Sequence, residues 1–409
     1  MTGKAKTFQA LSYPNYRLLW LGQLGASASL WMEQVARPWL MLELTGSAVA
    51  LGLVSAARMV PMLIFGLLAG VVADRFDRLR ILFLCQIAST AVHVATAVLI
   101  LSHLIQPWHV YVLAFAMGTS MAFNQPARQA LIPSLVDREH LTNAVALNTV
   151  AMNMMRIAGT SVGGILIATL GLGNVYLLNA ALYVWVIVVT LKIRVPSDRQ
   201  PTHLQESMWA SYTQGLRYAW HNRIALGSIS LAVALFLFGL PYASVFIPLF
   251  ARDVLKTGSF GMGSLMATTG AGALLGALAV ATLGSLRRRG RILIAGVVLF
   301  GASLIAFSTV SWLHVLPLSY LTIAVVGLVQ TSYMSINNTV LLESAPPGMH
   351  GRVMSLMSLD RGLVPLGAMF AGFLAASVGP QAGLIIFGSL CIFTATVIAI
   401  LIPSLRQID

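Results

Sequence analysis

The most informative stretch of the sequence is VALGLVSAARMVPMLIFGLLAGVVADRFDRLR, residues 49–80. Residues 49–73 of this stretch are almost entirely apolar, and Arg58 is the one charged residue among them. A helix needs roughly 20 such residues to cross the hydrocarbon core of a bilayer. The stretch therefore predicts a membrane-spanning helix, followed by a short basic link at the membrane surface.

Similar apolar stretches recur along the whole chain, at roughly 16–44, 49–73, 80–102, 108–133, 141–169, 174–193, 224–251, 260–284, 291–312, 315–342, 353–378 and 381–403. The composition agrees with this pattern, because 58% of the 409 residues are hydrophobic and only 9% are charged. So few charges are too few to cover the surface of a soluble protein of this length. We predict an all-α membrane protein with about twelve transmembrane helices in a lipid bilayer.

The formal net charge of +13 would also suit a nucleic-acid-binding protein, so the positions of the basic residues matter more than their number. They gather in alternate links between the apolar stretches, and the links of the other set hold only Arg252 and Lys256. This asymmetry follows the positive-inside rule. It predicts a multi-pass protein with both termini in the cytoplasm and without a nucleic-acid partner.

Residues 194–223 interrupt the apolar pattern with two prolines and several charges. We predict a cytoplasmic linker here, between an N-terminal six-helix bundle over residues 1–193 and a C-terminal six-helix bundle over residues 224–409. The second part of the linker has apolar residues at helical spacing, which favours a helix at the membrane interface. The alternative is an unstructured linker.

Short sequence matches relate the two halves. Thr45-Gly46-Ser47 recurs as Thr257-Gly258-Ser259, and Gly171 aligns with Gly379 at a similar offset. Two pseudo-symmetric bundles of this kind place a cavity near the bilayer midplane, and rocking of the bundles exposes it alternately to each side. The pattern is typical of a carrier.

The link from Gly70 to Arg80, GVVADRFDRLR, resembles the signature loop between helices two and three of the major facilitator superfamily. Asp77 stands where many members have glycine. The resemblance implies the twelve-helix fold of that superfamily and a cytoplasmic gate in which Asp74 meets the start of the eleventh helix. The alternative is a solvated loop that only sets the topology. The residues expected at the gate are Gly70, Asp74, Arg75, Arg78, Arg80, Arg128 and Arg352.

A longer string, NQPARQALIPSLVDREHLTNAVALN from Asn124 to Asn148, is similar to the bacterial export branch that includes the enterobactin exporter and macrolide efflux carriers, the transmembrane secretion effector type. This resemblance implies an exporter of the bacterial inner membrane. Antiporters of the superfamily commonly have Gly-Pro-x-x-Gly-Gly in helix five. Here residues 159–164 read GTSVGG, so the proline is missing and only close packing through the glycines is expected.

Ionisable residues at membrane depth are costly, which makes them candidates for function. Glu33 and Arg37 are four residues apart on one helix face, where their side chains can meet. Glu33 is the only acid deep in the first half and is the predicted proton acceptor, and Asp360, next to Arg361, is the second candidate. The alternative is that both acids belong to static ion-pair networks.

The predicted cavity combines charged and adaptable apolar side chains. Arg58, Arg128 and Arg156 either hold an anionic group of the substrate or satisfy backbone carbonyls, and the position of Arg128 near the inner end of its helix favours the gate. Its methionines either line the cavity for bulky apolar solutes or pack in the core. The residues expected around the cavity are Trp31, Glu33, Arg37, Arg58, Met152, Met155, Arg156, Met357 and Arg361.

These observations favour a secondary active transporter that exports a bulky amphipathic small molecule, a siderophore-like metabolite or a drug, in exchange for protons. The sequence has no Gly-x-x-x-x-Gly-Lys-Ser/Thr loop for ATP, and no set of residues that would indicate an enzyme, a cofactor or a metal site. One alternative is a lysophospholipid flippase or facilitator, in which cavity arginines would hold the phosphate. A more remote one is a non-transporting sensor of the same fold. We expect a monomer.

Overall fold

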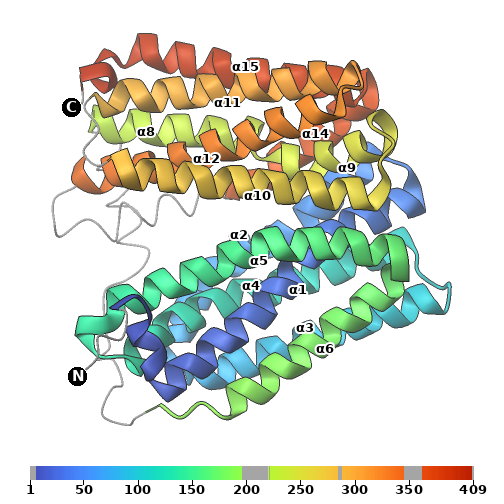
Figure 1. Ribbon diagram of the computed structural model, residues 1–409, viewed down its shortest axis with the longest axis vertical. Helices are drawn as coiled ribbons and strands as arrows, with labels where there is room; N and C mark the ends of the chain where they lie inside the picture. The colour runs from blue at the N-terminus through green and yellow to red at the C-terminus, as the bar shows by residue number, and fades with distance from the viewer. Residues whose placement is uncertain (1–5, 196–219, 221, 284–287, 345–361, 408–409) are drawn as a thin grey trace. The chain divides into compact units, whose positions relative to one another are not determined.

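The computed structural model describes residues 6–195, 220, 222–283, 288–344 and 362–407, and it contains helices and no strand within these ranges. The chain forms two compact units (Figure 1). Unit 1 comprises Met1–Leu40 and Ala57–Gln205, and unit 2 comprises Met41–Ala56 and Glu206–Asp409. Unit 2 therefore includes the tip of the first helical hairpin in addition to the second half of the chain.

Unit 1 is built from long helices joined by short links. The short 3-10 helices η1 (Lys6–Ser12) and η2 (Arg138–His140) precede α1 and α5. The long helices are α1 (Pro14–Thr45), α2 (Ala48–Arg75), α3 (Arg78–Leu101), α4 (Pro107–Leu135), α5 (Leu141–Leu170) and α6 (Leu172–Leu191).

In the second half of the chain, unit 2 contains a continuous helical stretch, Arg223–Val254, whose second part is largely π-helical. Pro241 and Pro248 lie in this part, and each removes a backbone donor from the helix. The stretch consists of α8 (Arg223–Ala234), η4 (Leu235–Gly239), η5 (Tyr242–Phe246), α9 (Ile247–Leu249) and η6 (Phe250–Val254). The helices that follow are α10 (Gly258–Leu283), α11 (Arg289–Trp312), α12 (Leu316–Ser344), α14 (Val364–Val378), α15 (Pro380–Leu401) and η8 (Pro403–Gln407).

The apolar helices confirm the predicted all-α membrane fold. Among the described residues, nine helical stretches have the length and composition to cross a membrane, and the apolar helix α14 is shorter. The helices α1 and α4 are also long but are more polar, so the number twelve stays a prediction. The predicted interfacial helix and the inner part of the predicted eleventh helix lie outside the described residues.

The sequence repeat corresponds to repeated backbone geometry. The aligned glycines Gly46 and Gly258 have positive φ angles of 61° and 68°, and Gly171 and Gly379 have 79° and 86°. Glycine adopts positive φ angles without the steric cost that a Cβ brings. Each pair therefore marks the same kind of turn in each half of the chain.

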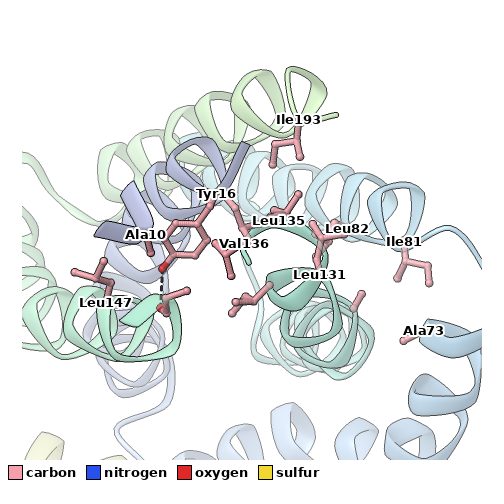
Figure 2. Close-up of a cluster of buried hydrophobic side chains, with 14 of the residues drawn as sticks. Ala10, Tyr16, Ala73, Ile81, Leu82, Leu131, Leu135, Val136, Leu147 and Ile193 are labelled. Atoms are coloured by element: carbon pink, nitrogen blue, oxygen red, sulfur yellow. Dashed lines mark hydrogen bonds between the residues drawn. The ribbon is translucent and has the colours of Figure 1, made fainter. Parts of the chain in front are cut away.

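A buried cluster at one end of unit 1 fixes α1 against α5 (Figure 2). The Tyr16 hydroxyl donates a hydrogen bond of 2.7 Å to the carbonyl oxygen of Ala144, and the Trp20 Nε1 donates one of 3.0 Å to that of Leu147. Leu82 and Leu131 of the same cluster are almost completely buried. These contacts set the direction of the helix that contains Glu33.

Asp77 has a local structural role at the start of α3. Its Oδ1 accepts a hydrogen bond of 2.9 Å from the backbone N–H of Leu79, so it is the N-cap of this helix. We expect Asp77→Ala to lower the free energy of unfolding by about 1 kcal/mol, measured as a lower midpoint of thermal unfolding in detergent. Asp77→Asn keeps a capping oxygen and is the control, because both variants lose the ion pair with Arg80. Equal midpoints for the two variants would contradict the capping role.

Candidate functional site: a charged cavity in unit 1

The described part of unit 1 contains a cavity of ≈ 560 Å³. This volume includes space that is open to solvent. The walls combine charged, polar and methionine side chains from α1 to α6. They are formed by Gln23, Ala26, Ser27, Leu30, Glu33, Arg58, Ser89, Met117, Ser120, Met121, Asn124, Gln125, Arg128, Met152 and Tyr183.

Glu33 is the centre of a buried ion-pair network on one wall. Its carboxylate Oε2 accepts a hydrogen bond of 2.9 Å from Arg58 Nη1, and its Oε1 lies 3.7 Å from Arg37 Nη1. All three side chains are at most 6% exposed. The structure thus brings together Glu33 and Arg37 as their spacing predicts, but the shorter contact is with Arg58 from α2.

His93 and two tyrosines also pack in unit 1. The fully buried His93 ring has its Nε2 3.3 Å from the Ser29 hydroxyl, one helical turn from Glu33. The ring centroids of Tyr176 and Tyr183 lie 5.9 Å and 5.4 Å from that of His93. Because these groups are packed against one another, α3 and α6 have a fixed position relative to α1.

Arg128 lines the same cavity from α4, whereas the sequence places it at the cytoplasmic gate. It is 5% exposed, and its Nη1 has a long contact of 3.5 Å with the carbonyl oxygen of Leu19. Among the described residues, no carboxylate forms an ion pair with it. Arg128 therefore adds a positive charge to the cavity that the Glu33 network does not balance.

Glycines of α5 allow close packing next to the network. A Cβ at Gly159 would lie 2.9 Å from Cβ of Trp31, and one at Gly163 would lie 3.0 Å from Cα of Met32. The close contact of α5 with α1 is therefore present without the proline of the antiporter pattern. It lies within one turn of Glu33 along α1.

The other predicted cavity residues on α5 occupy different positions. Met152 lines the cavity, whereas Met155 and Arg156 are half-buried and lie outside its walls. The Arg156 guanidinium lies 5.4 Å from the centroid of the Trp31 ring, which is a cation–π contact. Met357, Asp360 and Arg361 lie outside the described residues.

At the predicted cytoplasmic gate, Arg78 joins the start of α3 to α4. Its Nη1 donates a hydrogen bond of 2.9 Å to the carbonyl oxygen of Ala130. Arg80 pairs with Asp77 at 3.6 Å, and both are exposed. Gly70, Asp74 and Arg75 lie in the last turns of α2, where Arg75 is exposed. Arg352, the expected partner from the other half, lies outside the described residues, so the gate stays a prediction.

Uncharged polar residues of the cavity are absent from the sequence-based prediction. Gln23 donates a hydrogen bond of 2.6 Å to the hydroxyl of Ser27, and the hydroxyls of Ser89 and Ser120 lie 2.8 Å apart. Serine and glutamine also occur on packed transmembrane helices, so their type alone does not indicate a cavity. Among the described residues, no group of three or more His, Cys, Asp and Glu side chains could hold a metal ion.

Comparisons with known proteins agree with this architecture. The family model of the transmembrane secretion effectors matches residues 5–409. The multidrug efflux pump Tap of Mycolicibacterium fortuitum is 30% identical over 403 residues, which cover 96% of either chain. Macrolide efflux protein A of Streptococcus pyogenes is 24% identical over 409 residues, which cover 97% of this chain and 99% of the relative.

Solved structures show the same fold. The crystal structure of a POT family transporter in complex with a thioalcohol-conjugated peptide has a TM-score of 0.80 at 11% identity, and the match covers 98% of this chain and 100% of that one. The family match and the efflux relatives confirm the resemblance seen in the sequence and exclude an enzyme. The chain belongs to the transmembrane secretion effector family of the major facilitator superfamily, whose members are multi-pass membrane transporters.

Proposed function

We propose that this protein exports a bulky amphipathic small molecule, a siderophore-like metabolite or a drug, by alternating access in exchange for protons. The proposal places it as a monomer in the bacterial inner membrane, with both termini in the cytoplasm. The relatives support export, because two of them are an efflux pump and an efflux protein. The observation on which the proton exchange rests is that Glu33 is the only carboxylate among the described residues that line the cavity.

Glu33 is suited to a coupling role because its charge holds two helices together. In the ionised form its carboxylate accepts the hydrogen bond from Arg58, which ties α1 to α2. A proton on Glu33 removes the ionic part of this contact and leaves the Arg58 charge buried without its counter-ion. Protonation therefore changes the relative stability of two arrangements of these helices, which is what exchange by alternating access requires. Asp360 remains the second candidate for the proton site.

The cavity walls fit an amphipathic substrate. Met117, Met121 and Met152 offer flexible apolar surface that adapts to different shapes. Asn124, Gln125 and Tyr183 provide hydrogen-bonding groups in the same cavity. This combination suits a molecule with a bulky apolar body and a few polar groups.

Inverted membrane vesicles test the proposal directly. An acidic lumen in such vesicles corresponds to the outside of the cell, and a difference of one pH unit sustains about a tenfold accumulation for each proton exchanged. We expect at least one member of a radiolabelled panel, including a macrolide and a carboxylate siderophore, to accumulate in the lumen only while the gradient is present. Vesicles without the protein, and vesicles treated with nigericin to remove the pH gradient, are the controls. If accumulation is the same with and without the gradient, proton exchange is wrong, and if no panel member accumulates beyond the controls, the proposed substrate range is wrong.

A further inference from the structure

Positive charge exceeds negative charge around the cavity. Among the described residues, Arg58 and Arg128 line the cavity, and Arg37 is buried next to Glu33 but outside the cavity walls. Glu33 is the carboxylate of the lining, and its ion-pair partners are Arg37 and Arg58. Buried charges in proteins are normally paired, because an unpaired ion loses its hydration without compensation. Glu33 pairs with Arg58 at 2.9 Å and lies 3.7 Å from Arg37, whose Nη1 has no hydrogen-bond partner among the described residues. Arg128 has no carboxylate within ion-pair distance among those residues, and it lines the cavity directly.

The guanidinium of Arg128 has few protein partners among the described residues. A guanidinium has five N–H donors, and the contact with Leu19 at 3.5 Å uses one of them at the limit of hydrogen-bond length. The side chain is 95% buried and still belongs to the cavity wall. Asn124 and Gln125 line the same cavity, and they precede Arg128 on α4 by about one helical turn. Their side-chain amide groups can donate hydrogen bonds to an anion.

We infer that Arg128 is the binding subsite for an acidic oxyanion group, a carboxylate or a phosphate, of the molecule that this cavity accepts. The planar guanidinium matches such a group with two parallel hydrogen bonds. The apolar body of the same molecule then lies against Leu30, Met117 and Met152. The inference rests on the proposed function in one respect, namely that the exported molecule passes through this cavity. It implies that the substrate is an amphipathic organic anion.

The subsite is separate from the proposed proton site. An anion at Arg128 leaves the hydrogen bond between Glu33 and Arg58 intact, since three guanidinium groups can balance both the carboxylate and the substrate. The substrate therefore needs no proton on Glu33 to bind. A membrane potential that is negative inside also favours the outward movement of an anion, and so it adds to the drive for export.

Matched acids and amides test this subsite. Naphthalene-1-acetate and 4-phenylbutyrate differ from their carboxamides in charge but little in shape. Their equilibrium binding to the full-length protein in lipid nanodiscs, corrected with empty nanodiscs, is measured without any gradient. We expect the wild type to bind at least one acid roughly tenfold or more tightly than its amide, because a charge-assisted bidentate contact is lost in the amide.

Variants of Arg128 assign the preference to this side chain. Arg128→Gln should bring the affinity for the acid down to that for the amide, and Arg128→Lys should keep part of the difference. Arg291→Gln also removes one arginine charge, but from an exposed position on α11, and is the matched control that should keep the full preference. If Arg128→Gln does not fold, the test is the ratio of the affinity for the acid to the affinity for its amide in the wild type and in Arg128→Lys. A smaller ratio in Arg128→Lys than in the wild type supports the subsite, and an equal ratio contradicts it.

Three results would overturn the inference: no acid in the wild type binds better than its amide, the preference persists in Arg128→Gln, or it disappears equally in Arg291→Gln. Competition with inorganic phosphate distinguishes the source of the anion. If phosphate alone binds as tightly as the acids, the subsite takes a free anion and the assignment to a substrate group is wrong. Acid binding without gradient-driven accumulation would leave the subsite in place and refute the proposed proton exchange instead.

Discussion

Glu33→Gln should reduce the gradient-driven accumulation in inverted vesicles to the level of vesicles without the protein. For a gradient of one pH unit this is a loss of about tenfold for each proton exchanged. The reason is that glutamine has nearly the shape of glutamic acid but cannot release or take up a proton. The measurement is the ratio of accumulated solute with and without the gradient, in wild type and variant, at equal amounts of protein in the membrane.

The stability of the network needs a control of its own. Glu33→Gln leaves Arg58 charged and buried without the partner that now lies 2.9 Å away, which costs about 3–5 kcal/mol in comparable buried pairs. The double variant Glu33→Gln/Arg58→Gln removes both charges. We expect its midpoint of thermal unfolding to recover toward the wild-type value, while gradient-driven accumulation stays absent.

Gradient dependence that survives in Glu33→Gln and in the double variant would show that Glu33 is not the proton site. Asp360→Asn then decides between the two acids. If this variant alone abolishes the dependence on the gradient, the proton site is Asp360. If both acids can be neutralised without effect, the coupling group is a different one.

The membrane fold is predictable from the sequence because the thickness of the bilayer sets a minimum number of apolar residues for every helix that crosses it. The apolar stretch over residues 49–73 and the basic link after it lie in α2 and at the start of α3. The repeat of Thr45-Gly46-Ser47 also has a physical reason, because Gly46 and its counterpart Gly258 both have a positive φ, which costs glycine less than other residues. The π-helical turns around Pro241 have no such signature, since a proline inside a membrane helix is compatible with several local geometries.

The candidate site is predictable only along single helices. The spacing of Glu33 and Arg37 gives their contact, because residues four apart share a helix face. The contact of Glu33 with Arg58 depends on how α1 and α2 are rotated against each other, which periodicity does not specify. Arg128 shows the same limit, because its position near the inner end of α4 suits a gate, while the rotation of α4 turns it into the cavity wall.

Helix rotation is set partly by glycines, and Gly118 is the one with the clearest consequence. A Cβ at this position of α4 would lie 1.9 Å from the carbonyl oxygen of Arg58 in α2. The second half has the equivalent contact, because a Cβ at Gly327 would lie 2.0 Å from the carbonyl oxygen of Thr269. In each half, a glycine thus lets two helices approach closely. In the first half, the glycine of α4 packs against the backbone of Arg58, whose side chain lines the cavity.

Gly118→Ala should therefore destabilise the protein by about 3 kcal/mol or more, since a backbone atom cannot move aside as the end of a side chain can. We expect a markedly lower midpoint of thermal unfolding in detergent and a loss of transport in the surviving folded fraction, because α2 must shift and take Arg58 away from Glu33. Gly66→Ala is the matched control, since Gly66 lies in α2 with no atom within 4 Å of its added Cβ. Its stability should be unchanged or higher, because alanine favours a helix by about 1 kcal/mol over glycine. If both variants unfold at the same temperature, the contact between Gly118 and Arg58 does not determine how α2 and α4 pack, and the placement of Arg58 opposite Glu33 must depend on other contacts of α2.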